Sequence, residues 1–263
     1  MKKMKVTVLG LWSSAHIGET PSFLIETDQA NILLDMCPGV VRQLKRCGFS
    51  LPNLDIAFGS HVHSDHLSGS TYLTFQHMLE SRSVPNSKEL TFCGTSNVIQ
   101  AIDSALKLYY PERSFKYKTI KVSNDCISSF KSGNIRLTFA KGKHTVDVTA
   151  IRIEIDGYPS ICYTSDGFFT DEIYSISKNV DLLIGEAFGT YESMKDRYQT
   201  IMHSLGVHLG ELADKAKAKN IIPFHMGYQY NNPSNRNMLI NEIQRNYKGN
   251  IIWAGEDLFS IEL

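Results

Sequence analysis

The stretch Ser60-His-Val-His-Ser-Asp-His-Leu-Ser-Gly69 is the strongest indication of fold and chemistry in this chain. Within six residues it places His61, His63, Asp65 and His66. Imidazole and carboxylate groups are ligands that suit zinc and related divalent ions. His61 and His63 stand two positions apart in an extended loop, so both can point at one ion. Asp65 and His66 begin the next helix and can reach a second ion. The stretch therefore predicts a metal centre rather than a solvated polar loop.

Short apolar runs and amphipathic segments surround this stretch. A strand is predicted directly before it, at residues 54–58, and a helix directly after it, at residues 66–80. Further strands are predicted at residues 5–9, 23–26, 32–35, 89–93, 115–122, 127–130, 135–140, 150–155, 160–164, 180–184, 221–224 and, as the last strand, 251–252. Helices are predicted at residues 39–47, 95–108, 168–176, 208–219 and 235–247. Two groups of strands with helices around them predict an α/β (α+β) fold of two packed sheets flanked by helices.

Composition excludes several classes of protein. The 263 residues carry 27 Lys plus Arg and 27 Asp plus Glu, which argues against non-specific coating of nucleic acid. No apolar run reaches the ~20 residues of a membrane helix, and the N-terminal apolar run is too short for a signal peptide. The five cysteines are scattered without a C-x-x-C pair, so we expect no disulfide framework and a reducing, cytoplasmic compartment. One domain over residues 1–263 is expected.

The order His-x-His-x-Asp-His resembles the motif of the metallo-β-lactamase superfamily, and the resemblance extends over nearly the whole chain. It implies a four-layer αββα sandwich and three further ligands, which the sequence supplies as His144, Asp166 and His225, each after a β-rich run. The resemblance implies a first ion held by His61, His63 and His144, and a second held by Asp65, His66 and His225. Asp166 and a water or hydroxide would bridge the two. The expected cofactors are two divalent ions, zinc first and manganese as the alternative. His63 also favours hydrolysis over redox chemistry.

Within that superfamily the chain resembles the ribonuclease Z-like branch. The similarity lies in residues 8–15, 23–26 and 34–44, in residues 182–188 around Glu186, and in residues 202–204 around His203. The resemblance implies that His203 donates a proton to the leaving oxygen or stabilises its charge, and that Glu186 orients the imidazole. Asp65 is grouped with this pair as a catalytic residue. The branch's usual acidic, Gly-rich turn is altered here to Met36-Cys-Pro-Gly39.

The distance between His144 and Asp166 bears on the substrate. Members of the branch that mature transfer RNA 3′ ends usually insert a long flexible arm here, whereas this chain has 21 residues, filled by two predicted strands and an Asp-Gly turn. Relatives without the arm include phosphodiesterases of small cyclic phosphates and of cyclic nucleotides, among them phage enzymes that destroy the cyclic pyrimidine signals of bacterial defence.

We therefore expect a phosphodiesterase that hydrolyses 3′,5′-cyclic nucleotides by attack of the bridging hydroxide on phosphorus, in a bacterial cell or a phage-infected host. The alternatives are a transfer RNA 3′-processing endonuclease and a phosphodiesterase of other small cyclic phosphates. A lactone, thioester or β-lactam hydrolase would not need Glu186 with His203. A non-catalytic binding protein ranks last, because all seven ligands are present.

A small nucleotide also needs a pocket for its base. Tyr228, Tyr230, Asn231 and Asn232 follow His225 closely and could stack on and hydrogen-bond a base, although a Tyr/Asn-rich turn before a helix is as good an interpretation. The resemblance implies a homodimer, and the expected partners are a small nucleotide and no membrane, with RNA not favoured. His77 and His208 have no assigned role. Neither has His16, which follows the first strand near the expected edge of the site.

Overall fold

Alternate side chains of the first strands belong to two different apolar cores, one on each face of the sheet. In β2 (Ser22–Glu26), Phe23 and Ile25 belong to one apolar core, whereas Leu24 between them belongs to another. β3 (Asn31–Leu34) repeats the pattern, with Leu33 facing the second core. Because successive side chains of a strand point to opposite faces, this sheet is covered on both sides. In the computed structural model, residues 2–14, 18–85, 87–123, 125–255 and 258–263 are described.

Among the described residues the strands form two seven-stranded sheets. In spatial order, the first contains β14 (Ser260–Glu262), β1 (Lys5–Gly10), β2, β3, β4 (Ile56–Phe58), β5 (Thr91–Thr95) and β6 (Lys118–Val122). The second contains β13 (Asn250–Ile251), β12 (Asn220–Phe224), β11 (Leu182–Glu186), β10 (Ile161–Tyr163), β9 (Thr149–Ile155), β8 (Ile135–Lys141) and β7 (Ser128–Ser132). The larger apolar core contains residues of both sheets.

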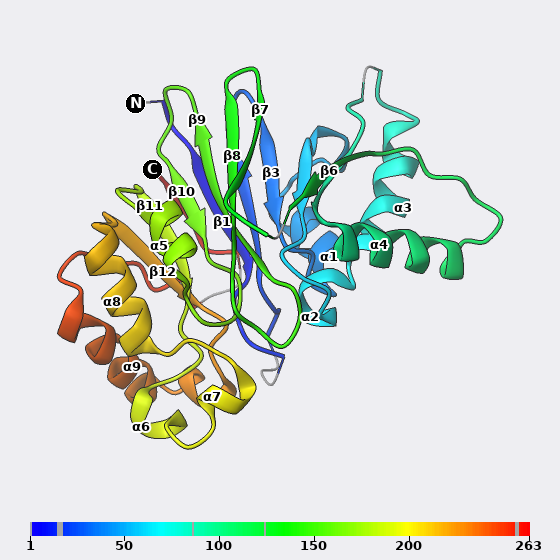
Figure 1. The fold of residues 1–263 in the computed structure, drawn as a ribbon. Helices are drawn as coiled ribbons and strands as arrows, with labels where there is room; N and C mark the ends of the chain where they lie inside the picture. The colour runs from blue at the N-terminus through cyan, green and yellow to red at the C-terminus, as the bar shows by residue number, and fades with distance from the viewer. Residues whose placement is uncertain (1, 15–17, 86, 124, 256–257) are drawn as a thin grey trace.

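Helices cover the outer faces of both sheets (Figure 1). On the side of the first sheet lie α1 (Val40–Arg46), α2 (Ser64–Leu67), α3 (Ser70–Ser81) and α4 (Ser96–Tyr109), together with the short 3₁₀ turn η1 (Leu51–Asn53). On the side of the second sheet lie α5 (Asp171–Ser177), α8 (Gly206–Ala216) and α9 (Pro233–Asn246). Two short helices, α6 (Tyr191–Met194) and α7 (Tyr198–Ile201), and the turn η2 (Tyr228–Asn231) complete the chain. The predicted αββα sandwich is therefore confirmed.

Two predictions about elements were wrong. The helix expected at residues 66–80 is divided into α2 and α3 at Gly69, whose backbone N–H donates to Met36 O at 3.0 Å. A Cβ on Gly69 would lie 2.1 Å from Cys37 O, so the α2–α3 junction needs a glycine to pack this closely on the 36–37 turn. The strand at 251–252 is not the last one, since β14 follows and pairs with β1 at the edge of the first sheet.

Strand directions position the site. β10, β11 and β12 run parallel, so their carboxyl ends meet at one edge of the second sheet. β8 is antiparallel to β9, and β9 is antiparallel to β10, so β8 ends at that edge as well. In the first sheet β3, β4 and β5 are parallel. The segments that follow these ends, including the short helix α2, carry every ligand that the sequence predicts.

Candidate metal centre

The carboxyl ends of four strands bring the predicted ligands to one place. His61 follows β4, His144 follows β8, Asp166 follows β10 and His225 follows β12. His63 lies just before α2, and α2 carries Asp65 and His66. All seven side chains converge on this edge, although they are spread over residues 61–225 of the chain. Parallel strands collect functional loops at their carboxyl ends, which explains the convergence.

Three imidazoles form a first cluster. The Nε2 atom of His61 lies 3.1 Å from Nδ1 of His63, and Nε2 of His144 lies 3.3 Å from the same Nδ1 atom. Each of the three residues therefore directs one nitrogen toward a common point, with His63 using Nδ1 and the other two using Nε2. This is the donor set that the sequence predicts for the first ion.

A second cluster lies beside the first. The Nε2 atom of His225 is 3.5 Å from Asp65 Oδ2, and Nε2 of His66 is 3.8 Å from the same oxygen. The carboxylate of Asp166 stands 3.2 Å from each of these two nitrogens. It also groups with His61 of the first cluster, so Asp166 occupies the position between the two donor sets that a bridging ligand needs.

The polar atoms of this centre fit a pair of cations. Nε2 of His66, Nε2 of His225 and Oδ1 of Asp166 are buried without a hydrogen-bond partner. Buried polar atoms without partners are costly in a folded protein unless an ion or water satisfies them. Two imidazole nitrogens and a carboxylate oxygen, all aimed at one space, form a donor set of the type that zinc and similar ions bind. The residues present thus fit the metal that the chemistry implies.

The hydrogen bonds behind the histidines set their tautomers. Nδ1 of His66 donates to Asp35 at 2.7 Å, Nδ1 of His144 to Met202 O at 2.9 Å, and Nδ1 of His225 to Glu186 at 3.1 Å. A ring that donates through Nδ1 keeps a lone pair on Nε2 when it is neutral. These partners therefore turn the basic nitrogen of each ring toward the centre.

Asp35 belongs to the centre although it is not among the residues predicted from the sequence. Its buried carboxylate accepts hydrogen bonds from the backbone and hydroxyl of Ser60, from His66 and from the hydroxyl of Tyr163, at 2.6–2.8 Å. The Ser60 hydroxyl donates to Asp35, so it accepts from Nδ1 of His61, 2.9 Å away. Asp35 thus holds both His61 and His66. The available signal was an aspartate at the end of a buried strand, next to the altered turn.

His203 and Glu186 meet beside the ligands. Nδ1 of His203 donates to Glu186 Oε1 at 2.6 Å, and the imidazole stacks on the ring of Phe188 with centroids 4.5 Å apart. Glu186 is fully buried, and its other oxygen accepts from the backbone N–H groups of Gly167 and Ser204. A cavity of about 380 Å³ is lined by His203 and Phe188 together with five of the predicted ligands: His63, Asp65, His144, Asp166 and His225.

The two clusters differ in their electrostatics. Burial, together with neighbouring imidazoles, holds the pKa of His61 well below its ordinary value and also lowers the pKa of His63. Burial alone would lower the pKa of His225 too, but the carboxylates of Asp166, Asp65 and Glu186 outweigh it and raise that pKa to about 9. The pKa of His66 is raised in the same way by Asp166 and Asp35.

Among the residues expected to bind a base, Tyr230 is the one whose placement the structure contradicts. The ring of Tyr230 is buried in the core, and its hydroxyl accepts from Thr190 N at 2.6 Å, so Tyr230 packs the loop and does not line the metal cavity. Asn231 and Asn232 are exposed, and Asn232 caps α9 through Ser234 N. The side chain of Tyr228 and all of His16 lie outside the described residues. The prediction that Tyr230 stacks on a base is therefore wrong, because a buried ring with a hydrogen-bonded hydroxyl offers no face to a substrate.

The two other unassigned histidines are also away from the cavity. His77 is buried on α3, and His208 accepts a hydrogen bond from Leu205 N at the start of α8.

This fold, with seven candidate ligands converging at one edge, defines a metallo-hydrolase. The model of the beta-lactamase superfamily domain matches residues 30–226, so the chain belongs to that family. The chain is similar to the probable metallo-hydrolase YhfI of Bacillus subtilis (26% identity; 85% of this chain, 87% of the relative). It is also similar to ribonuclease Z of Ignicoccus hospitalis (21% identity; 88% of this chain, 90% of the relative). Family and relatives together identify a hydrolase.

Solved structures share the fold. The crystal structure of Bacillus subtilis YhfI matches with a TM-score of 0.79 and 24% identity over 100% of both chains. The short form of human tRNase Z matches at 0.77, with 19% identity over 98% of both chains. Yeast PDE1 matches at 0.68, with 15% identity over 97% of this chain and 98% of that one. No helix of the described residues is long and apolar enough to cross a membrane.

The role of Asp35 can be tested by Asp35→Asn. Asparagine tolerates the left-handed backbone that Asp35 adopts (φ 55°), so the substitution removes charge with little backbone strain. We expect metal affinity to fall about 10–100-fold, as for other groups that orient ligands. Competition with a chromophoric chelator measures it. Asp181→Asn, which removes a carboxylate from the far end of β11, serves as the control. An unchanged affinity in Asp35→Asn would refute the role.

The pKa pattern predicts how metal uptake depends on pH. Neighbouring carboxylates raise the pKa values of His66 and His225, that of His225 to about 9, whereas burial lowers the pKa values of His61 and His63. Because metal ions bind neutral imidazole, uptake should release protons from the second cluster, and affinity should rise with pH until these groups are neutral. Calorimetric titration in buffers of different ionisation enthalpy counts the protons. Uptake without proton release would contradict the assignment.

Proposed function

We propose that this protein is a dinuclear metal-dependent phosphodiesterase that hydrolyses 3′,5′-cyclic nucleotides. The first ion would be held by His61, His63 and His144, and the second by Asp65, His66 and His225, with Asp166 between them. When bound, two such ions supply Lewis acidity and an activated water for displacement at phosphorus. The observation that carries the proposal is the His203–Glu186 pair at the same cavity, since ester hydrolysis needs a group that protonates the leaving oxygen.

His203, Glu186, Phe188 and Asp65 would have different roles around the scissile phosphate. Glu186 accepts the Nδ1 proton of His203, which leaves Nε2 as the nitrogen that can exchange a proton with substrate. The stack with Phe188 holds the imidazole plane. Asp65 would act both as a ligand and as a catalytic carboxylate, because it lines the cavity and faces His225. His203 would then deliver its proton to the leaving oxygen.

A folded, compact connection between His144 and Asp166 favours a small substrate. Residues 145–165 contain β9, β10 and a turn at Gly157 with φ of 87°, and no long arm projects from them. The cavity at the ligands, about 380 Å³, is of a size that suits a mononucleotide. Both observations support a cyclic nucleotide over a folded RNA.

A transfer RNA 3′-processing endonuclease is the second candidate. The observation that favours it is that curated relatives are ribonuclease Z enzymes, which the chain matches over most of their length. Other small cyclic phosphates form the third substrate class. The balanced charge of the chain, 27 basic and 27 acidic residues, gives the RNA alternative no general support.

Three further parts of the proposal concern the molecule as a whole. We propose one catalytic unit, because both sheets share one apolar core. The homodimer implied by the resemblance stays a prediction that light scattering can check. A cytoplasmic location is supported by five cysteines that are all free.

The substrate class can be tested with a hydrolysis panel on metal-quantified protein. We expect turnover of 3′,5′-cyclic CMP, UMP, AMP or GMP that disappears in Asp166→Ala, because that variant loses the carboxylate between the two clusters. The panel includes 2′,3′-cyclic nucleotides and a precursor transfer RNA. Cleavage of the precursor transfer RNA alone would contradict the proposal and favour the endonuclease.

The proton-donor role of His203 can be tested by His203→Gln. We expect kcat for a cyclic nucleotide to fall about 10²–10⁴-fold with unchanged metal content, as for other general acids. A substrate with a 4-nitrophenolate leaving group should lose far less, since that group leaves without protonation. His77→Gln, a buried histidine outside the cavity, is the control. Equal losses on both substrates would show that His203 only positions the substrate.

A further inference from the structure

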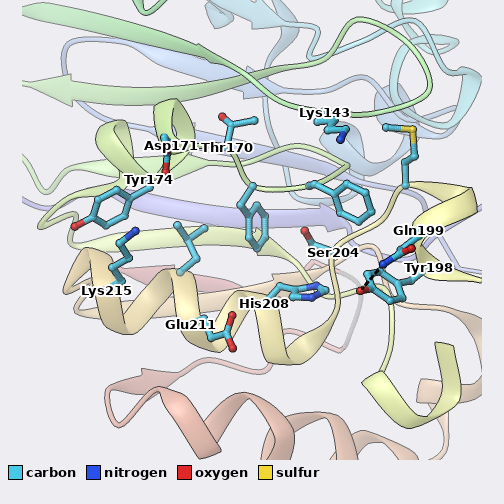
Figure 2. A pocket seen from close by; sticks show the side chains of 14 residues that line it. Lys143, Thr170, Asp171, Tyr174, Tyr198, Gln199, Ser204, His208, Glu211 and Lys215 are labelled. Carbon is cyan, nitrogen blue, oxygen red and sulfur yellow. Dashed lines mark hydrogen bonds between the residues drawn. The ribbon is translucent and has the colours of Figure 1, made fainter. Parts of the chain in front are cut away.

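A second and larger cavity, between α5, α7 and α8, borders the metal cavity at residues 201–204. It measures about 740 Å³, against about 380 Å³ for the cavity at the ligands. Figure 2 shows Lys143 and Thr170 on one side of it, His208 and Glu211 of α8 on the other, and Tyr198 at one end. Its size falls in the range of ligand sites. Neither the proposed mechanism nor the predicted ligands use it.

The wall between the two cavities is one stretch of chain. Along residues 201–204, Ile201 and His203 line the metal cavity, whereas Met202 and Ser204 line the larger one. The carbonyl oxygen of Met202 accepts a hydrogen bond from Nδ1 of His144, and the backbone N–H of Ser204 donates one to Glu186. The lining of the larger cavity therefore includes two residues that position His144 and the His203–Glu186 pair.

Other loops place a ligand and a cavity residue side by side. Lys143 lines the larger cavity and precedes the ligand His144. Phe168 lines it two residues after the ligand Asp166. A third hollow of about 510 Å³ is lined by Lys143, His144 and Thr170, so it shares residues with both cavities. The third hollow therefore adjoins the larger cavity at Lys143 and the metal cavity at His144.

The lining combines aromatic faces with hydrogen-bonding groups. The rings of Phe168 and Tyr198 meet edge to face with centroids 6.0 Å apart, and Tyr198 lies 5.4 Å from the ring of His208. Nδ1 of His208 accepts from Leu205 N, so its Nε2–H is a donor. Thr170, Gln199 and Glu211 add further donors and acceptors. Aromatic rings beside amide, hydroxyl and imidazole groups suit a flat heterocycle that stacks and hydrogen-bonds.

Charge in the lining is balanced. Two cations, Lys143 and Lys215, are matched by two anions, Asp171 and Glu211, and Lys215 lies over the ring of Tyr174 with 4.1 Å from nitrogen to centroid. A phosphate site would need a surplus of positive charge. The lining thus favours the neutral, aromatic part of a nucleotide over its phosphate.

We propose that this cavity binds a nucleobase, either the base of the substrate whose phosphate lies at the metal centre or the base of a free nucleoside. The proposal rests on the proposed function, because a phosphodiester at the metal centre is what brings a nucleotide to this edge. It moves base recognition from the Tyr228–Asn231 turn to Phe168, Tyr198 and His208, on the far side of the loop that carries His203.

Direct binding is the first arm of the test. Cytidine and adenosine are titrated calorimetrically into wild type, Glu211→Trp, which fills the cavity, and Asp214→Trp, which adds the same ring to an exposed site on α8 outside the cavity. We expect Glu211→Trp to weaken binding about tenfold or more, the loss that removal of one stacked base contact gives, and Asp214→Trp to leave it unchanged. Tyr198→Ala, with the exposed Tyr109→Ala as its control, is a second pair should Glu211→Trp fail to fold.

Kinetics distinguish the two sources of the base. The ratio of kcat/KM for 3′,5′-cyclic CMP to that for the 3′,5′-cyclic phosphate of methyl riboside, which lacks a base, should fall about tenfold in Glu211→Trp if the cavity holds the base of the substrate. A constant ratio with lost nucleoside binding assigns the cavity to a free nucleoside. The proposal is overturned if neither nucleoside binds wild type saturably, or if binding survives both Glu211→Trp and Tyr198→Ala. No turnover of either phosphate, with nucleoside binding intact, would refute the proposed function alone.

Discussion

The buried carboxylate of Asp35 is the constraint on which the rest of the centre depends. It stands at the end of β3 in the first sheet and accepts a hydrogen bond at 2.6 Å from Tyr163, which belongs to β10 in the second sheet. It also accepts hydrogen bonds from Ser60 and His66, and the Ser60 hydroxyl in turn orients His61. A single charge thus joins the two sheets and orients one histidine of each cluster. Burying it is costly without partners, and four hydrogen bonds supply them.

The apolar core and the metal centre are continuous around this carboxylate. The ring of Tyr163 packs on Phe23 and Phe224, with centroids 5.7 Å and 5.0 Å away, and Phe224 is followed directly by His225. Packed strand ends thus fix the backbone positions from which the candidate ligands project, which is the preorganisation that two-metal chemistry requires. The centre is also asymmetric. Burial lowers the pKa values of His61 and His63 in the first cluster, whereas carboxylates raise the pKa values of His66 and His225 in the second, so the two positions should differ in how protons compete with metal.

Much of the fold and centre could be predicted from sequence because it is encoded locally. The His-rich stretch after an apolar strand and the three later ligands after further strands are patterns within short windows, and the structure brings all of them together. Asp35 could not be assigned because its partners lie up to 128 residues away, and its position at the end of a buried strand does not reveal that it accepts four hydrogen bonds. The break at Gly69 was missed for the same reason, since it depends on contact with the backbone of residues 36 and 37. The role of Tyr230 was predicted wrongly because the sequence of a Tyr/Asn-rich turn is the same whether the tyrosine ring is buried or exposed.

Hydrolysis by this protein should depend on two ions held by this centre. The measurement that tests it most directly is the rate of 3′,5′-cyclic nucleotide hydrolysis as zinc or manganese is returned stepwise to chelator-stripped protein. The account predicts no turnover without metal and a rate that rises to a plateau at about two equivalents per chain, as two-metal catalysis requires. Turnover in the stripped protein, or a plateau that Asp166→Ala reaches equally well, would contradict it.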